Sequence, residues 1–313
     1  MTTYKGIKGL SLQTVAGDPS NLSAGQIWYN NSAKKIKVFK AGAGAWATGN
    51  DSNASHGAGM MAGTQTASIT AGGYRPGSPN TGADSEEYNG TSWAEGNNIP
   101  ANRTAFWGAG TQTAALTAGG SPGSGAVAET IEYDGTSWSA TNDLGTGRYG
   151  AGTGGIQTAG LQVGGYSGGT KSEVEEYNGS TWTEVTNTPA AKYKVALMGT
   201  QTAMLCHSEE VVVLDYDGTN WTTGTNSPES IANGGAAGTN TAAFVFSNND
   251  SQTWNGTAWT TVADMNVERQ EQGGCGSVTA ALAGGGEISP APAFKQTEEW
   301  SDPNLVTATF TSS

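Results

Sequence analysis

Cysteine and histidine are scarce, with only two of each in 313 residues. Cys206 and Cys275 lie far apart, and neither has neighbours at metal-ligand spacing, which argues against a disulfide scaffold and against a metal centre built on cysteine. We interpret both as small buried residues and leave a disulfide between them open. The adjacent Cys206-His207 pair would point to opposite faces of a strand and would not readily hold one ion. We therefore expect no metal and no cofactor.

Basic residues and long apolar runs are scarce as well. The chain has 14 Lys and Arg against 27 Asp and Glu, for a net charge of −13. Phosphate binding needs a positive surface, so we expect no nucleic-acid partner. No apolar run approaches the length of a membrane helix, and the opening MTTYKGIKGLSLQ lacks the apolar stretch of a signal peptide. We expect neither a signal peptide nor membrane insertion.

Glycine is abundant instead, with 48 residues, alongside ten tryptophans and ten tyrosines. Disordered chains are poor in aromatic residues, so this composition argues for an ordered protein despite its low complexity. Many short strands joined by glycine-rich turns, with small side chains between sheets, account for both features.

A repeated segment indicates the architecture. Gly-Thr-Gln-Thr-Ala begins at Gly63, Gly110 and Gly199, and looser copies begin at Gly155, Gly238 and Gly276. The copies follow one another at intervals of roughly 38 to 47 residues, and self-similarity at such a period is typical of repeat folds. What recurs is expected to be scaffold, so function is expected in what differs between copies.

A second motif recurs at the same intervals as the first. It reads EYNGTSW from Glu87, EYDGTSW from Glu132 and EYNGSTW from Glu176, with looser copies from Asp215 and Thr253. Asn-Gly or Asp-Gly between aromatic runs predicts a hairpin with a type I′ turn, which needs positive φ at both central residues. Tyr ends one strand and Trp begins the next, which predicts an aromatic contact in every unit. The repeated Trp residues are assigned to the scaffold.

Each unit supplies four short strands: one before Gly-Thr-Gln-Thr-Ala, one from its Thr-Ala to a glycine pair, one ending in Glu-Tyr and one starting at Trp. Four strands per repeat of this length are the blade of a β-propeller. We predict an all-β propeller of six four-stranded blades over residues 51–313, with Trp300 and Leu305 in the Tyr and Trp positions of the sixth. Residues 1–50, with an expected hairpin of Ile27–Asn30 and Ile36–Phe39, form an attachment arm, complete a blade at the ring closure, or supply part of a seventh blade.

The order basic residue, apolar strand, Gly-Gly, Glu-Tyr, Trp resembles the Kelch repeat from about Ser52 onward. The combined sequence pattern GTQTAAL…GG…EEYNGTSW is similar to the repeats of Kelch-type proteins encoded by bacteriophages, particularly marine ones. The segment Ser23–Phe39 resembles an N-terminal segment of phage tail and fibre proteins. These resemblances imply a Kelch-like propeller in a virion structural protein, assembled in the host cytoplasm and associated with a tail fibre or a surface decoration.

One column of the repeat is basic. This column is the position eight residues before the first Thr of each Gly-Thr-Gln-Thr-Ala copy, or before the residue that replaces that Thr. It holds His56, Arg103, Arg148, Lys192, Ile231 and Arg269. In a propeller these positions form a ring on one face or at the channel mouth, where cations could bind anionic or polar groups of a sugar. The alternative is structural, because an Arg here is part of the Kelch pattern and binds neighbouring backbone carbonyls.

The loops after the glycine pairs differ most between copies. They are long in copies one, two, three and six and nearly absent in copies four and five, and insertions of this kind fall on one face of a repeat fold. Candidate ligand-binding residues there are Tyr74, Arg75, Tyr166 and Lys171, and Trp107 and Tyr149 follow the basic column. Aromatic rings beside polar groups suit carbohydrate recognition. Surface loops without a ligand are the alternative.

Catalysis has little support in the sequence. Galactose oxidase shares the Kelch-type propeller, but a copper site of its kind needs clustered His, Tyr and Cys ligands. The pairs Glu86-Glu87 and Glu175-Glu176 suggest a glycosidase, yet Glu87 and Glu176 recur with the motif and are interpreted as scaffold. No Ser-His-Asp order stands out. We expect no enzyme; an enzyme would lose turnover when Glu86, Glu175 or His207 is changed.

Two functions of different classes remain. The first is a tail-fibre or surface adhesin whose propeller recognises a host glycan or receptor, with residues 1–50 binding other virion proteins. The second is an architectural capsid or tail protein that cements its neighbours and has no external ligand. The uneven loops favour recognition, because a uniform spacer would not need long loops on some blades only. We expect an oligomer of unspecified size.

Overall fold

The structure, a computed structural model, describes residues 13–16, 27–32, 35–40, 44–75, 81–231, 234–288, 294–302 and 306–309. Parts of the variable loops that follow Tyr74 and Glu287 therefore lie outside the described residues. The chain divides into two compact units, one spanning Ala45–Ser301 and the other combining Met1–Gly44 with Asp302–Ser313. In the described part of the chain, no helix is long and apolar enough to cross a membrane.

The smaller unit contains a four-stranded sheet in the order β1-β2-β3-β28. Its strands are β1 (Gln13–Val15), β2 (Ile27–Asn30), β3 (Lys35–Lys40) and β28 (Val306–Thr309). β2 and β3 are antiparallel, with Ile27 opposite Val38, so the predicted N-terminal hairpin is confirmed. β28 pairs with β3, so segments from both parts of this unit share the sheet. The hairpin supplies no strand to a blade.

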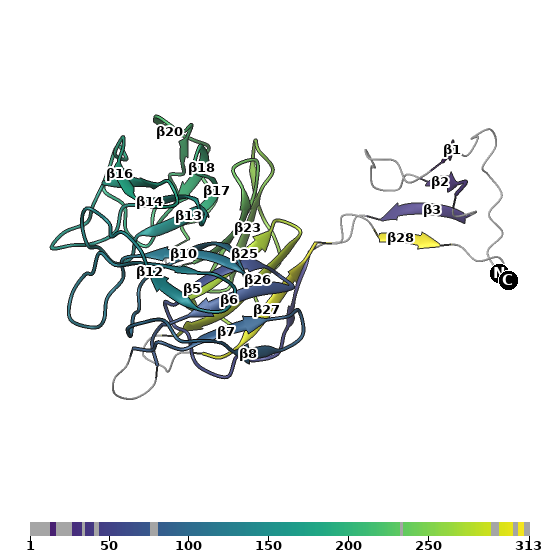
Figure 1. Cartoon of the computed structure of the whole chain (residues 1–313). Helices are drawn as coiled ribbons and strands as arrows, with labels where there is room; N and C mark the ends of the chain where they lie inside the picture. Colours follow the sequence, from purple (N-terminus) through teal and green to yellow (C-terminus); the bar gives the residue numbers. More distant parts are fainter. Residues whose placement is uncertain are drawn as a thin grey trace. The chain divides into compact units, whose positions relative to one another are not determined.

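The larger unit is a β-propeller of six blades, each an antiparallel sheet of four strands, as the repeats predict (Figure 1). Blades one to three consist of β5 (Met60–Thr64), β6 (Ala67–Ala71), β7 (Ser85–Tyr88) and β8 (Trp93–Glu95); β9 (Gly108–Thr111), β10 (Ala114–Ala118), β11 (Thr130–Tyr133) and β12 (Trp138–Ala140); and β13 (Gly152–Ile156), β14 (Ala159–Val163), β15 (Val174–Tyr177) and β16 (Trp182–Glu184). Blades four to six consist of β17 (Ala196–Thr200), β18 (Ala203–His207), β19 (Leu214–Tyr216) and β20 (Trp221–Thr223); β21 (Gly235–Thr239), β22 (Ala242–Ser247), β23 (Asp250–Trp254) and β24 (Trp259–Thr261); and β25 (Gln270–Ser277), β26 (Ala280–Glu287), β27 (Thr297–Ser301) and β4 (Ala45–Thr48).

The ring closes through β4. This strand pairs with β27, and Trp46 stands opposite Trp300 where the other blades place the Trp of their fourth strand. We expected Leu305 at this position. Leu305 lies outside the described residues, and Trp46 takes the position because the outermost strand of blade six comes from the N-terminal side of the propeller. The boundary between the units consequently falls after Gly44, earlier than the expected boundary after residue 50.

Gly-Thr-Gln-Thr-Ala forms the turn between the first and second strands of a blade. Its glycine has positive φ in every copy; at Gly63 φ is 119°, and an added Cβ would lie 2.3 Å from the Ala67 oxygen. Glycine alone fits such a position. The Gln side chain reaches the preceding blade, where Gln112 Nε2 donates to the Ser68 oxygen at 3.1 Å and to the Tyr88 oxygen at 2.8 Å. The motif therefore serves the scaffold.

The prediction of a type I′ turn at Asn-Gly is wrong. Tyr88 pairs with Trp93 across a loop of four residues, and within Asn89-Gly90 only the glycine has positive φ, at 87°. Asn89 Oδ1 instead accepts hydrogen bonds from the backbone amides two and three residues later, both at 2.9 Å, and so forms an Asx turn. The expected aromatic contact is present, because the Tyr88 and Trp93 ring centroids lie 4.9 Å apart.

Tyrosine hydroxyls join neighbouring blades. In four blades the Tyr of the third strand donates to the Glu on the third strand of the preceding blade, at 2.5 to 2.9 Å. The pairs are Tyr88 with Glu299, Tyr133 with Glu87, Tyr177 with Glu132 and Tyr216 with Glu176. These contacts account for the repeated acids as acceptors between blades, which agrees with their interpretation as scaffold.

Candidate functional site

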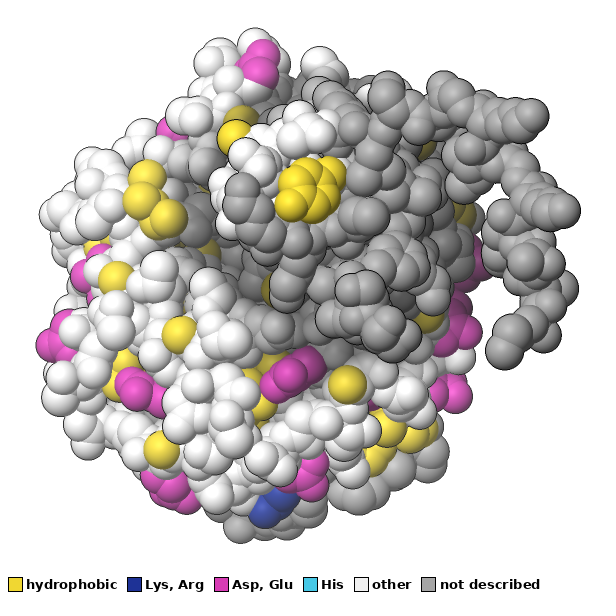
Figure 2. Space-filling view, turned by 90° about the vertical axis from the view of Figure 1, so that its right-hand side faces the viewer, with side chains coloured by type: hydrophobic (Ala, Val, Ile, Leu, Met, Phe, Trp, Pro, Cys, Tyr) yellow, Lys and Arg dark blue, Asp and Glu magenta, His cyan; other side chains and the backbone are white. Residues whose placement is uncertain are grey.

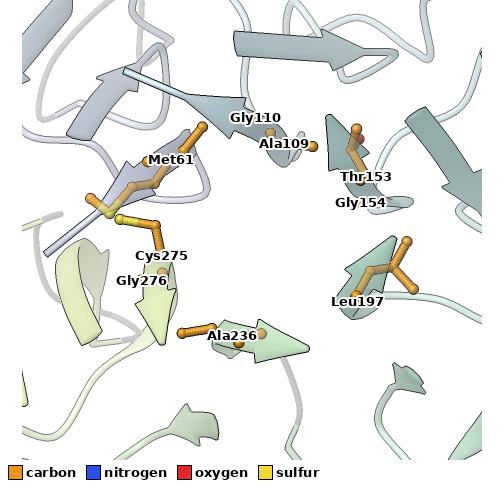
Figure 3. A pocket seen from close by; sticks show the side chains of 17 residues that line it. Met61, Ala109, Gly110, Thr153, Gly154, Leu197, Ala236, Cys275 and Gly276 are labelled. Carbon is orange, nitrogen blue, oxygen red and sulfur yellow. The ribbon is translucent and has the colours of Figure 1, made fainter. Parts of the chain in front are cut away.

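The first strands of the six blades surround a narrow central channel, seen along its length in Figure 3. A cavity in it has a volume of about 120 Å³ and is lined mostly by glycine and alanine, together with Met61, Thr153, Leu197 and Cys275. That volume corresponds to about four water molecules in the liquid. The cavity is too small for a sugar ring, so a ligand of that size would have to bind elsewhere, for example at the rim of the channel.

A series of backbone hydrogen bonds links five of the six blades at one end of the channel. The amide of Ala58 donates to the Glu271 oxygen at 2.7 Å, the amide of Ala105 donates to the Ala58 oxygen at 2.8 Å, and the pattern continues through Gly150 to Lys194. These residues stand two positions after the basic column, and their φ angles lie between 51° and 66°. Positive φ is strained for the members that are not glycine. This backbone conformation fixes Lys194 and Glu271 at the rim.

Four tyrosines gather beside this rim. The ring of Tyr149 lies 5.4 Å from that of Tyr166, and the ring of Tyr193 lies 6.1 Å from each. Tyr74 pairs with Gly57, which precedes Ala58 at the rim. Burial raises the pKa of Tyr74, and two carboxylates and Tyr149 raise it further. The structure thus brings together three sequence candidates, Tyr74, Tyr149 and Tyr166, and adds Tyr193.

Charged side chains border the tyrosines. Lys194 Nζ lies 3.7 Å from Glu271 Oε1, 3.9 Å from Glu209 Oε1 and 5.5 Å from the centre of the Tyr193 ring. Burial raises the pKa of Glu271, and Glu287 raises it further against the opposing effect of Lys194. Burial likewise raises the pKa of Glu287. Two partly desolvated carboxyl groups therefore share the rim with Lys194.

We name this group the axial cluster: Tyr74, Tyr149, Tyr166, Tyr193, Lys194, Glu271 and Glu287. A pocket of about 110 Å³ opens beside Tyr193 and is lined by Thr170, Glu209 and Glu210 among others. Tyrosine rings can cover the C–H face of a sugar, while carboxylates accept hydrogen bonds from its hydroxyls. The arrangement suits binding of a polar, uncharged ligand.

The basic column does not form an exposed ring, which corrects the expectation from the sequence. Its members, His56, Arg103, Arg148, Lys192, Ile231 and Arg269, are all 4% exposed or less. Each cation pairs with an acid of its own blade, as in Arg148 with Glu175 at 2.8 Å and Arg269 with Glu298 at 3.2 Å. Arg103 and Lys192 pair with Glu129 and Glu210, which are more than half exposed, and His56 Nε2 lies 3.0 Å from Glu86 Oε1. The basic side chains of the column are therefore directed toward acids of their own blades and are buried.

The remaining loop candidates have partners outside the axial cluster. Arg75 pairs with Asp84 across its own loop, and Lys171 Nζ lies 3.6 Å from Glu173 Oε1. Trp107 is half-buried and lines the channel next to Met61. The structure accounts for these three by contacts within a loop or within the channel.

His207 and Cys206 are buried inside blade four. His207 Nε2 lies 2.7 Å from Ser227 Oγ, and burial lowers the pKa of His207 to about 4. Cys206 and Cys275 are separate thiols, and burial raises the pKa of each to about 12. Among the residues that the structure describes, no group of three His, Cys, Asp or Glu side chains is placed to hold a metal ion.

Comparison with known proteins adds one finding to this geometry. No protein-family model matches the chain, and no curated protein matches it. Among solved structures, that of YjhT aligns with a TM-score of 0.67 and 13% identity, covering 84% of this chain and 99% of its own. The two share a fold. Since 622 chains of solved structures match and one fold hosts many functions, this likeness does not select a function.

Tyr193, Lys194, Glu271 and Glu287 were not among the sequence candidates. The repeat register carries a signal for three of them: Tyr193 holds the same position after the basic column as Tyr149, and Lys194 and Glu271 hold the next position. Glu287 follows the glycine pair of copy six, as Tyr74 and Tyr166 follow theirs. The informative columns are therefore the neighbours of the basic column and not the basic column itself.

Proposed function

We propose that this chain is a recognition protein of a bacteriophage virion and that its propeller binds a host surface glycan at the axial cluster. The observation that carries the proposal is the gathering of four tyrosines around Lys194, Glu271 and Glu287 at one end of the channel. The repeated residues of the blades are buried or bonded between blades. The axial residues differ from blade to blade and reach the surface, with Tyr166 36% exposed.

The chemistry of the cluster favours a neutral glycan. Tyr166 and Tyr193 offer ring surface at little cost in side-chain entropy, and their hydroxyls add polar contacts. Glu271 and Glu287 can accept hydrogen bonds from sugar hydroxyls, and Lys194 can donate them. Among the described residues on the face shown in Figure 2, acidic side chains are scattered and basic ones are few, in keeping with a net charge of −13. An anionic polysaccharide is accordingly disfavoured.

The virion part of the proposal rests on resemblance. The repeats resemble those of Kelch-type phage proteins, and Ser23–Phe39 resembles a segment of tail and fibre proteins. In this proposal the smaller unit binds other virion proteins, which leaves the propeller free to bind the host. Its being a separate compact unit supports that division of roles.

We propose no catalytic role for the paired acids. Burial alone would raise the pKa of Glu86, but hydrogen bonds from His56, Asn53 and Ala54 lower it overall. An acid held ionised by its neighbours is a poor proton donor. Glu175 is engaged by Arg148 and by the backbone amide of Gly145. Turnover of a glycan that disappears in Glu86→Gln or Glu175→Gln would contradict this assignment.

A glycan array with the full chain tests the proposal. We expect binding to neutral glycans, and the double variant Tyr166→Ala/Tyr193→Ala is expected to bind at least tenfold more weakly, since two aromatic contacts are lost. Ile156→Ala is the matched control, because Ile156 is 53% exposed and lies at the opposite end of β13 from Tyr149.

Three outcomes decide between the two functions. Selective loss in the tyrosine variant supports recognition at the axial cluster. Equal loss in Ile156→Ala would contradict the assignment of the site. No binding to any glycan, together with normal adsorption of particles that lack the protein, would favour an architectural role.

A further inference from the structure

Three polar contacts recur at the seams between consecutive blades. The Tyr–Glu contact and the Gln contact are described above. In the third, the Asn that follows the fourth strand reaches the turn of the next blade: Asn97 Nδ2 donates to the Thr136 oxygen at 2.8 Å, and Asn142 Nδ2 donates to the Ser180 oxygen at 2.9 Å. Together these contacts close a seam along its length.

All three residues are replaced at the seam between blades four and five. Trp254 stands in place of Tyr, Asn240 in place of Gln and Thr225 in place of Asn. Trp254 Nε1 donates to the Asn240 oxygen of its own blade at 2.9 Å, so it makes no contact equivalent to the Tyr–Glu pair. Asn240 is shorter than Gln, and Trp254 is bonded within its own blade. Thr225 takes part in a different contact, because its backbone oxygen accepts a hydrogen bond from Trp259 Nε1 of blade five at 3.1 Å.

The seam between blades five and six has also lost these residues, but aromatic packing closes it. Trp46, Phe244, Phe246 and Trp300 form one buried cluster, with ring centroids 4.7 to 5.7 Å apart. The seam between blades four and five is packed on its inner side by an apolar cluster that includes Leu205 and Trp254, and the rings of His207 and Trp259 lie 5.9 Å apart across it. This packing leaves the outer part of the seam open, where the groove lined by Asp215 and Trp254 lies.

An open groove occupies that seam. We name it the seam groove; it lies between Asp215 and Thr225 of blade four and Asn240, Trp254 and Thr257 of blade five, and its volume is about 570 Å³. Pockets for small ligands fall between roughly 300 and 1,000 Å³. The groove is therefore large enough for a small ligand, unlike the central channel.

Asp215 is the residue that the lost Tyr leaves exposed to the groove. It stands where Glu87, Glu132 and Glu176 stand in the first three blades, and those acids accept a Tyr hydroxyl. Within the described chain the Asp215 carboxylate has no hydrogen bond and no ion pair. It lies against Gly224, where an added Cβ would be 2.2 Å from Asp215 Oδ2. The carboxylate acceptor is thus retained at Asp215, but blade five has no Tyr hydroxyl to donate to it.

We infer that the seam groove binds a neutral sugar ring, whose hydroxyls take the place of the missing Tyr hydroxyl at Asp215. The carboxylate accepts hydrogen bonds from sugar hydroxyls, and the Asn240 amide and the threonine hydroxyls both donate and accept them. No Lys or Arg lines the groove, so an anionic sugar would meet the acid without a compensating cation. This site is independent of the axial cluster, since the two share no residue.

The test restores the missing contacts in the full chain. In Trp254→Tyr/Asn240→Gln, the new Tyr hydroxyl can donate to Asp215 and the new Gln can reach blade four, as at the other seams. We expect a higher melting temperature and at least a tenfold loss of sugar binding, measured by saturation-transfer NMR with a panel of neutral monosaccharides. Loss of binding in a more stable protein cannot be attributed to unfolding.

Further arms separate this site from the axial cluster and from other ligands. Asp215→Ala should lose the same sugar, and Tyr166→Ala/Tyr193→Ala should keep it. Unchanged binding in Trp254→Tyr/Asn240→Gln would overturn the inference. So would the absence of binding to any monosaccharide by the unaltered chain, or binding of methylguanidine in the groove without binding of sugars.

Discussion

At the scale of single residues, the fold places the cations of the basic column inside the blades. Arg148 is fully buried and lies 2.8 Å from Glu175, itself 4% exposed. A buried pair of this kind is retained because removing one member leaves the other charge without compensation in a region of low polarity. The basic column therefore stabilises the blades.

Removing one member of this pair should be costly. We expect Glu175→Ala to lower the free energy of unfolding by about 3–5 kcal/mol, since Arg148 keeps its charge without a partner. Arg148→Met/Glu175→Leu should recover most of that loss. Urea denaturation of both variants measures this; a cost below about 1 kcal/mol for Glu175→Ala, typical of an exposed pair, would contradict the account.

Because of His207, the free energy of unfolding should depend on pH. Burial lowers the pKa of His207 to about 4, whereas an unfolded histidine titrates near 6.5. Between these values the unfolded chain binds the extra proton, so stability should fall as the pH decreases from about 6.5 to 4, by on the order of 3 kcal/mol. In His207→Asn this contribution should vanish. Thermal unfolding across that range checks it, and an unchanged slope would contradict it.

At the scale of elements, the blades are joined by side chains that reach the neighbouring sheet. Gln112 holds two backbone oxygens of the preceding blade, and Gln157 and Gln201 do the same in the next two. Each of these amides satisfies carbonyl groups at the end of a β-ladder. The Gly-Thr-Gln-Thr-Ala repeat therefore contributes to the interface between blades as well as to its own turn.

A matched pair of substitutions tests this role. Gln112→Ala should lower the free energy of unfolding by about 1–3 kcal/mol, because two partly buried acceptors lose their donor. Asn240→Ala changes the same repeat position at the seam between blades four and five, where the shorter side chain makes no equivalent contact, and should cost less than about 0.5 kcal/mol. Equal losses in chemical denaturation would contradict the assignment.

The sequence predicted the strands well and the side-chain environments poorly. Periodic Gly-Thr and Tyr–Trp motifs place strands in every blade because hairpins are local. The pairing of Trp46 with Trp300 was not predicted, since it joins residues far apart and Leu305 matched the register. The burial of the basic side chains was not predicted either. The repeat register gives the position of a residue along the chain, but it does not show where the acid that pairs with it lies. For Arg269 that acid is Glu298, inside the same blade.

At the scale of the whole molecule, closure of the ring depends on a single short strand. β4 supplies the outer edge of blade six, and Trp46 Nε1 donates to Ser251 Oγ of blade five at 3.0 Å. The strand thus contacts two blades and lies at the point where the propeller begins and ends in sequence.

Truncation tests this closure. A chain that starts at Ala45 should keep the propeller's cooperative unfolding, because it retains β4. A chain that starts at Asn50 should lose it and expose the edge of β27, with a drop of many degrees in melting temperature, since the Trp46 packing is lost together with the strand pairing. Similar melting temperatures for the two chains would show that β4 is dispensable.

Hydrogen–deuterium exchange of the full chain, with and without a glycan that it binds, tests most directly whether the axial cluster is the recognition surface. We predict slower exchange in residues 147–150, 165–171 and 192–195, which carry Tyr149, Tyr166 and Tyr193, and no change in the Gly-Thr-Gln-Thr turns at the other ends of the strands. Protection confined to those turns, or spread evenly over all six blades, would contradict the account.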